Sequence, residues 1–240
     1  RVKKGEVTFY NLDGDEIEKE LKTIEWDAEA AEKAGYEHFM MKEIHEQPKA
    51  VLDTLNSVLK DGKIDLSEVG LEEESIRNIQ QIYIIACGSA YHVGMAAQYV
   101  IEDLVDVPVR VDLASEFRYR DPFVDENTLL ILVSQSGETA DSRQVLVKAN
   151  ELGIPSLTVT NVPGSTLSRE ADHTMLLHAG PEIAVASTKA YTAQIATLAF
   201  LAKAVGEANG NEKAKAFDLV HELSLVAQSI ESTLSEKEVI

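Results

Sequence analysis

Three short segments of the sequence combine glycine or alanine with small hydroxyl side chains. They are Cys87-Gly88-Ser89, Ser134–Thr139 and Val185–Thr188. Each segment comes directly before an expected helix. Free backbone N–H groups and the positive end of the helix dipole favour an anion at that place. We therefore expect these turns to bind an anionic group.

The second turn, S-Q-S-G-E-T, has more polar side chains than a helix cap needs, because one Ser or Thr suffices. Ser134, Ser136 and Thr139 are predicted to form a phosphate cradle, with Gln135 reaching a sugar hydroxyl. The alternative is an ordinary capped helix with a spare serine. The turn has no Lys or Arg, and the chain has neither a P-loop nor a dinucleotide fingerprint. These features favour one phosphomonoester over a nucleoside triphosphate.

The segments around these turns alternate between short apolar runs and helical patterns. The expected strands are Gln81–Ala86, Pro108–Leu113, Thr128–Val133, Pro155–Thr160 and Thr174–Leu177. The expected helices are Tyr91–Leu104, Ser115–Tyr119, Ala140–Leu152, Ala190–Val205 and Glu212–Leu234. This alternation predicts an α/β fold, a three-layer α/β/α sandwich with a doubly wound, mostly parallel five-stranded sheet. Ligands of such sheets bind outside the carboxyl ends of the strands, where strand order reverses.

The N-terminal part of the sequence differs from this pattern. We expect residues 1–35 to be a linker with the tail of a missing preceding domain, and residues 36–240 to form the α/β domain with its N-terminal and C-terminal helices. The chain opens with Arg1 rather than Met, which is typical of a piece of a longer protein. A strand end at Val7–Tyr10 is followed by a predicted turn at Asn11–Asp15, which lacks the oxygen spacing of a calcium loop. Three helices are expected to follow, at Glu16–Gly35, Phe39–Glu46 and Pro48–Lys60.

Composition excludes several classes of function. The 240 residues include 22 Lys and Arg against 41 Asp and Glu, a formal net charge of −19. Such a surface repels phosphate backbones and anionic lipids, so we expect neither nucleic acid nor membrane as a partner. Cys87 is the one cysteine, which excludes an internal disulfide and favours a reducing, cytoplasmic location. The six His residues lack metal-ligand spacing, so no metal or cofactor is expected.

Five motifs of the chain resemble one known family. They are A-C-G-S-A, S-E-F-R-Y-R, S-Q-S-G-E-T-A-D, N-V-P-G-S and V-A-S-T-K-A, in that order. Together they are similar to the sugar isomerase (SIS) domain family, and within it to the isomerase half of the glutamine–fructose-6-phosphate aminotransferases. Full-length members have a glutaminase domain followed by two SIS domains. The resemblance runs from Trp26 to the end and matches the linker and the first SIS domain.

The resemblance implies a ligand and a set of contacts. Fructose 6-phosphate or glucosamine 6-phosphate would bind at the phosphate-binding residues Ser134, Gln135, Ser136 and Thr139, and at the sugar-lining residues Cys87, Gly88, Ser89, Val185, Ala186 and Ser187. The family's lysine, base and histidine lie elsewhere, so no catalytic residue is assigned and this chain alone would bind sugar phosphate without turnover. A homo-oligomer is also implied. The family usually has A-C-G-T-S, so Ala90 lacks a hydroxyl that other members carry.

Two other functions remain open, a non-catalytic sugar-phosphate sensor and a fructosamine-type deglycase with the same domains. S-E-F-R-Y-R and N-V-P-G-S favour the aminotransferase. Several nucleophilic or charged residues could be either catalytic or structural. For each of them a structural or pocket-lining role is preferred to a catalytic one. These residues are Cys87, His92, Lys189, Glu138 and the cluster Glu116, Arg118 and Arg120.

Overall fold

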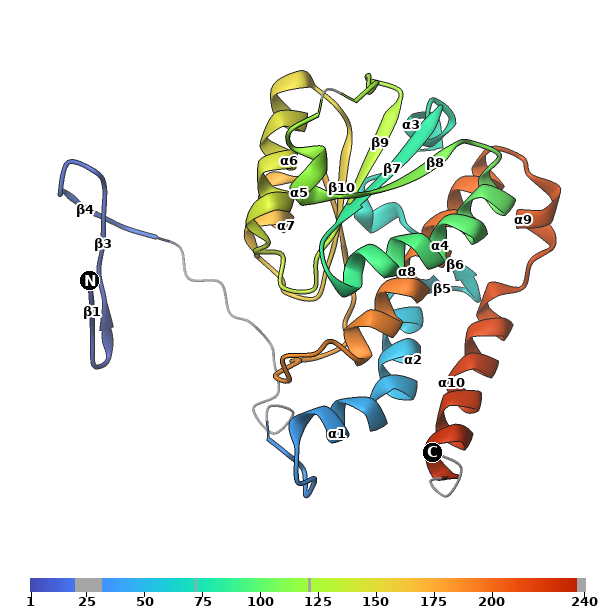
Figure 1. Ribbon diagram of the computed structural model, residues 1–240, viewed down its shortest axis with the longest axis horizontal. Coiled ribbons are helices and arrows are strands. Elements are labelled where there is room, and N and C mark those ends of the chain that lie inside the picture. Colours follow the sequence, from blue (N-terminus) through green and yellow to red (C-terminus); the bar gives the residue numbers. More distant parts are fainter. Residues whose placement is uncertain (20–31, 72, 121, 237–240) are drawn as a thin grey trace.

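A five-stranded sheet forms the centre of the computed structural model, which describes residues 1–19, 32–71, 73–120 and 122–236 (Figure 1). The strands lie in the order β11-β10-β9-β7-β8, and all neighbours are parallel. Their bounds are β7 Gln81–Ala86, β8 Val109–Leu113, β9 Thr128–Val133, β10 Ser156–Thr160 and β11 His173–Leu176. The predicted strands are confirmed to within about two residues. The central strands β7, β9 and β10 are buried on both faces, whereas the edge strands β8 and β11 are only partly buried.

Helices cover both faces of the sheet (Figure 1). One face carries α4 Ser89–Val105 and α8 Lys189–Ala208, and the other carries α5 Ala114–Phe117, α6 Ala140–Leu152 and α7 Thr166–Glu170. Successive residues of β7 alternate between two cores. Ile82 and Ile84 pack on the α4 and α8 side, and Tyr83 and Ile85 pack on the α6 side. The predicted three-layer, doubly wound α/β/α sandwich is confirmed.

Further helices extend the α8 side. They are α1 Phe39–His45, α2 Gln47–Ser57, α3 Glu73–Arg77, α9 Glu212–Ala216 and α10 Leu219–Ser235. Helix α2 packs against α8, and α10 packs against α2 in turn. Ala50, Val51 and Leu55 of α2 are buried in the same core as the sheet. This packing places the end of α1 near the start of α8.

The structure differs from the predicted helices in two places. The helix expected over Pro48–Lys60 stops at Ser57, and a small hairpin follows with strands β5 Leu59–Lys60 and β6 Lys63–Ile64 and then the 3-10 turn η2 Ser67–Val69. Its two turn residues, Asp61 and Gly62, both have positive φ (49° and 76°), as Asp-Gly hairpin turns require. The helical region expected over Glu212–Leu234 consists of two helices, α9 and α10, because Asp218 accepts a hydrogen bond from His221 N–H and caps α10.

The N-terminal residues form two small hairpins. Strand β1 Val2–Lys3 pairs with β2 Glu6–Val7, and β3 Phe9–Tyr10 pairs with β4 Glu16–Ile17. Asn11 Oδ1 accepts hydrogen bonds from Asp13 N–H (3.0 Å) and Asp15 N–H (2.8 Å), which confirms the predicted turn. The helix predicted over Glu16–Gly35 is wrong at β4 and at residues 32–35, which are not helical, and its residues 20–31 lie outside the described residues.

Candidate functional site

The strand order reverses between β7 and β9. Their following helices, α4 and α6, lie on opposite faces of the sheet (Figure 1). Ala86 at the end of β7 is paired with Val133 at the end of β9, so Cys87 and Ser134 leave the sheet side by side. A doubly wound sheet binds its ligand at this kind of reversal. The first and second predicted turns therefore meet where a ligand site is expected.

The second turn is held together by its own hydroxyl groups. Ser134 is 3% exposed, and its Oγ lies 2.8 Å from Thr139 Oγ1 and accepts a hydrogen bond from Gly137 N–H at 3.1 Å. Ser136 Oγ accepts from Glu138 N–H at 3.2 Å. Gly137 has a φ of +66° and is buried, which allows the chain to turn back on itself. The three predicted hydroxyls thus belong to one compact turn.

Helix α6 begins directly after this turn. Thr139 is its N-cap residue, yet the Thr139 side chain makes no cap hydrogen bond because it contacts Ser134 instead. Backbone N–H groups of the first helical turn are therefore left without a side-chain cap. Helix dipole and N–H groups together suit a phosphate dianion, and Gln135 is only half-buried beside them.

Glu138 is the one carboxylate of the turn, and it anchors the turn to its neighbour. Its Oε1 accepts a hydrogen bond from Thr166 N–H at 2.8 Å, at the start of α7. Hydrogen bonds from Thr166 hold the pKa of Glu138 below its ordinary value, with smaller contributions from Arg169 and Arg143. Gly137 C=O accepts from Leu167 N–H at 3.0 Å in addition. Glu138 thus acts as a hydrogen-bond acceptor for the neighbouring loop, which supports the structural role preferred from the sequence.

The first turn presents free groups at the start of α4. Gly88 has φ 58° and ψ −134°, a conformation that disfavours any side chain. Ser89 is exposed, and its hydroxyl has no hydrogen-bond partner among the described residues. Cys87 is half-buried and packs against the core on the α6 side. Ala90, which departs from the family pattern, is 7% exposed and lies in the core on the α4 side.

His92, one turn into α4, is exposed. Its Nδ1 lies 3.1 Å from Gly88 O, and its ring contacts Tyr91 edge-on with centroids 5.5 Å apart. This placement supports the structural interpretation that the sequence favoured.

The third turn differs from the other two because a protein carboxylate already occupies it. Glu182 Oε1 accepts hydrogen bonds from Thr188 N–H (2.8 Å) and Ala190 N–H (3.2 Å), and Glu182 Oε2 accepts from Ser187 Oγ (3.0 Å). A carboxylate of the same chain, that of Glu182, therefore already binds the N-terminus of α8. Val185 and Ala186 are exposed, whereas the N–H groups of Thr188 and Ala190 are already bonded to Glu182.

Sequence reasoning did not find Glu182. It stands six residues before Thr188, outside the spacing of an N-cap or capping box. It also did not assign a role to Asn161 in N-V-P-G-S. Asn161 N–H donates to Gln135 O at 3.0 Å, its Nδ2 donates to Gly180 O at 2.7 Å, and its Oδ1 accepts from Ala179 N–H at 3.1 Å. Asn161 therefore joins the second turn to the loop that leads to the third.

Charged residues near these turns are paired. Arg118 forms an ion pair with Asp141 in the first turn of α6, close to the candidate phosphate turn. Arg120 is paired with Asp112, and Glu116 is exposed. Lys189 is 3% exposed and donates to Glu46 Oε2 at 2.7 Å, which supports its structural interpretation.

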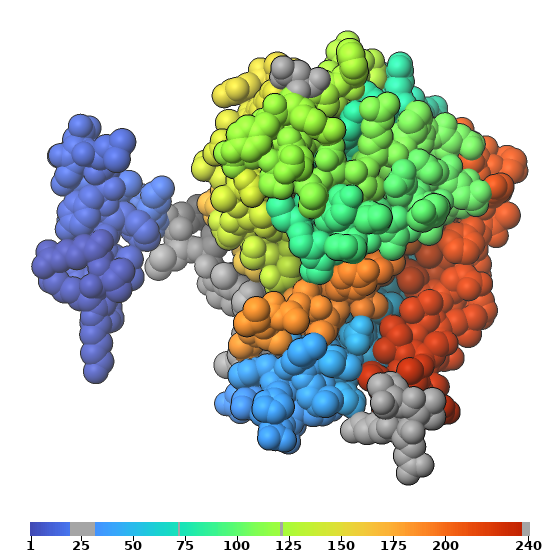
Figure 2. Space-filling model, in the orientation of Figure 1, coloured from blue at the N-terminus to red at the C-terminus, as the bar shows by residue number. Residues whose placement is uncertain are grey.

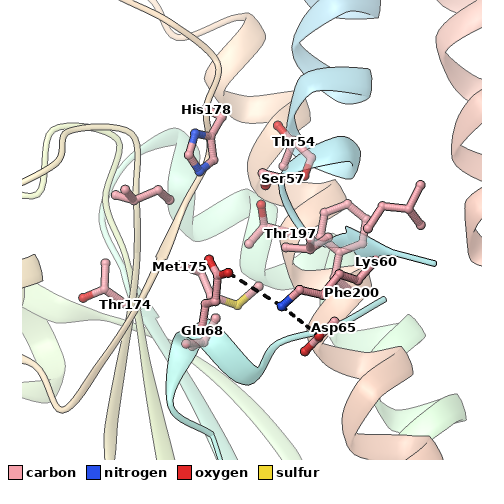
Figure 3. A pocket seen from close by; sticks show the side chains of 14 residues that line it. Thr54, Ser57, Lys60, Asp65, Glu68, Thr174, Met175, His178, Thr197 and Phe200 are labelled. Atoms are coloured by element: carbon pink, nitrogen blue, oxygen red, sulfur yellow. Dashed lines mark hydrogen bonds and ion pairs between the residues drawn. The ribbon is translucent and has the colours of Figure 1, made fainter. Parts of the chain in front are cut away.

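A separate cavity of about 420 Å³ lies beside β11, between α2, the β5–β6 hairpin and α8 (Figure 3). None of the ten predicted site residues lines it. Lys60 lies between Asp65 (3.3 Å) and Glu68 (3.7 Å) in this cavity. The hydroxyl groups of Thr54 and Ser57, which also line this cavity, donate to backbone carbonyls. These polar groups of the cavity are thus engaged within the chain.

Within residues 1–19, 32–71, 73–120 and 122–236, His, Cys, Asp and Glu side chains form no group of three or more able to hold a metal ion. No helix among those residues combines the length and apolarity needed to cross a bilayer.

Comparison with known proteins identifies the family. The SIS domain model matches residues 75–204, more than half of the chain and the whole of the sheet from β7 to β11. The chain therefore belongs to the SIS domain family. Within that family it is similar to glutamine–fructose-6-phosphate aminotransferases (isomerizing). It is 58% identical over 240 residues to that of Streptococcus pneumoniae strain R6, covering 100% of this chain and 40% of that protein.

Other similar proteins point to the same family. The aminotransferase of Streptococcus agalactiae serotype V is 57% identical over 242 residues, covering 100% of this chain and 39% of that protein. The chain thus spans about 40% of the length of these curated relatives. The solved C-terminal domain of glucosamine-fructose-6-phosphate aminotransferase from Francisella tularensis is 39% identical with a TM-score of 0.76, covering 82% of this chain and 55% of that one. A putative phosphosugar isomerase from Silicibacter pomeroyi is 25% identical with a TM-score of 0.62, covering 81% and 56%.

Proposed function

We propose that this chain is the first SIS domain of a glutamine–fructose-6-phosphate aminotransferase, and that it binds fructose 6-phosphate or glucosamine 6-phosphate. The longer protein would convert fructose 6-phosphate and glutamine to glucosamine 6-phosphate and glutamate. The match of the whole of this chain to about 40% of the length of the Streptococcus relatives supports this assignment.

The observation that carries the binding proposal is the hydroxyl-rich turn at the start of α6. Ser134, Ser136 and Thr139 lie in one turn at the strand reversal, beside N–H groups that no side chain caps. The start of α8 is filled by Glu182, so the phosphate belongs at α6. Cys87, Ser89 and the exposed Val185–Ser187 segment would then surround the sugar.

The remaining parts of the proposal concern what completes the site. We propose that a glutaminase domain and a second SIS domain of the same protein supply the catalytic groups, and that the protein assembles as a homo-oligomer. Residues 1–35 would be the linker from the preceding domain, and 36–240 the sugar-phosphate-binding domain. The single, half-buried Cys87 is consistent with a cytoplasmic location.

Removing one cradle hydroxyl is expected to weaken binding. Ser134→Ala, Ser136→Ala and Thr139→Ala should each reduce fructose 6-phosphate affinity about ten- to a hundred-fold, because a hydrogen bond to a charged group contributes about 1.5–3 kcal/mol. Isothermal titration calorimetry measures the change. Ser57→Ala is the matched control, since its hydroxyl lines the separate cavity beside β11. Parent-like affinity in all three cradle variants would remove the phosphate assignment.

The purified chain is expected to bind without turnover. No lysine, base or histidine of the family's catalytic set is assigned to it, so fructose 6-phosphate and ammonia should yield no glucosamine 6-phosphate. Turnover is measured by an enzymatic assay for glucosamine 6-phosphate with the purified chain at micromolar concentration. Steady multiple turnover would show that the chain carries catalytic groups of its own.

A further inference from the structure

Helix α1 carries charged side chains where a surface helix would carry apolar ones. Lys42 is 4% exposed and Glu43 is 2% exposed. Lys and Glu are almost never fully buried unless they are paired, because desolvating a charge is costly. The contacts of these residues therefore indicate what α1 does.

Glu43 holds the backbone of the loop before α8. Its Oε1 accepts hydrogen bonds from Ile183 N–H at 2.6 Å and from Ala184 N–H at 3.0 Å. These two N–H groups directly precede Val185, the first residue of the third turn. The contact joins positions 140 and 141 residues apart in the sequence. Bonds from N–H groups to a carboxylate are charge-assisted and stronger than neutral ones.

The residue after α1 holds the other end of the same loop. Glu46 Oε2 accepts from Lys189 Nζ at 2.7 Å, and Glu46 Oε1 lies 3.4 Å from Lys42 Nζ. Lys189 is the first residue of α8. Residues 183–189 are thus fixed at both ends by side chains from α1 and the position that follows it. In Figure 2 the blue surface of α1 adjoins the orange surface of this loop.

One feature of Glu43 is not explained by packing α1 onto the fold. Its Oε2 is buried and has no hydrogen-bond partner among the described residues. An unpaired buried carboxylate oxygen is destabilising. An apolar side chain would dock the helix without that cost, whereas only an acceptor at Oε1 orients the two N–H groups.

We propose that Glu43 is a positioning residue for the sugar-phosphate site. It fixes the backbone at residues 183 and 184 so that Val185–Ser187 takes the shape that receives the sugar, while the phosphate is held separately by the turn before α6. This inference rests on the proposed function. It assigns to α1 a role in sugar recognition.

The test compares three variants of the full chain. Glu43→Ala removes the acceptor, Glu43→Gln keeps an oxygen acceptor, and Glu37→Ala is a matched control because Glu37 is exposed just before α1. Affinity for fructose 6-phosphate is measured by calorimetry, and affinity for inorganic phosphate by NMR titration. Amide hydrogen exchange at Ile183 and Ala184 reports the loop directly.

For Glu43→Ala we expect at least a tenfold loss of fructose 6-phosphate affinity, unchanged inorganic phosphate affinity and loss of exchange protection at both amides. Glu43→Gln should restore sugar-phosphate affinity to within about threefold of the parent, because its amide oxygen can still accept from Ile183 N–H and Ala184 N–H. Glu37→Ala should match the parent throughout.

Other outcomes overturn the inference. Parent-like sugar-phosphate affinity in Glu43→Ala removes the positioning role. An equal loss of both affinities, or no rescue by Glu43→Gln, makes Glu43 a general structural residue. If the parent binds inorganic phosphate but no sugar phosphate, the proposed function fails instead. The role of Glu43 in sugar recognition then falls with it, and amide exchange tests only whether Glu43 holds the backbone at residues 183 and 184.

Discussion

Replacing Gly137 with alanine is expected to abolish sugar-phosphate binding and to lower the free energy of unfolding by about 2–5 kcal/mol. Gly137 has a φ of +66°, a conformation that costs other residues about 1–2 kcal/mol. A Cβ there would overlap Ser165 Oγ and lie 2.5 Å from Ser165 Cβ. Such overpacking costs a further 1–3 kcal/mol or so. The turn must then open, which separates the cradle hydroxyls.

Gly164→Ala is the matched control for this prediction. Gly164 has a similar φ of +71°, but nothing lies within 4 Å of a Cβ built there. The Gly164→Ala variant should lose about 1–2 kcal/mol of its free energy of unfolding and keep its affinity for fructose 6-phosphate. Urea unfolding and calorimetry measure both quantities. Equal effects of the two substitutions would show that the contact between Gly137 and Ser165 does not shape the site.

Gly206→Ala is expected to destabilise the fold by about 2 kcal/mol or more, although alanine is normally favoured over glycine in a helix by about 1 kcal/mol. Gly206 lies in α8 where that helix passes close to the end of α4. A Cβ there would overlap the backbone carbonyl oxygen of Leu104 and lie 2.6 Å from Ala214 Cβ. A backbone carbonyl cannot move aside without displacing α4. The midpoint of chemical denaturation measures the change.

Gly94→Ala provides the comparison. A Cβ at Gly94 would lie 2.9 Å from side-chain methyl groups of Ile84 and Val111, which can shift by a few tenths of an ångström. Its loss of stability should therefore be smaller than that of Gly206→Ala. A stabilising effect at Gly206, or a larger loss at Gly94, would contradict the close approach of α8 to α4.

The central sheet could be predicted from the sequence because its signals are local. Gln81–Ala86 and Thr128–Val133 are apolar runs of six residues, and they form β7 and β9 with those bounds. Ala140–Leu152 has helical periodicity and forms α6 as predicted. A strand buried on both faces, followed by a small polar turn and a helix, needs no distant information to be recognised.

The predictions that failed depended on neighbours or on turn chemistry. The helix expected from Glu16 was wrong because Glu16 and Ile17 pair with Phe9 and Tyr10 across a turn set by the Asn11 side chain. The helix expected to reach Lys60 was wrong because Asp61 and Gly62 form a tight hairpin turn. Charge-rich or apolar helical patterns do not by themselves show where backbone pairing interrupts them.

The sequence by itself determined the strands, the helices around them and the hydroxyl-rich turn of Ser134, Ser136 and Thr139, since these depend on residues close together in the chain. Only the tertiary structure decided which helix start remains available for a phosphate. Glu182 fills the start of α8 from a loop position without a capping motif, and Glu43 reaches the same loop from 140 residues away. Hydrogen bonds between distant segments leave no periodic pattern in the sequence, because they form only after the sheet has brought those segments together.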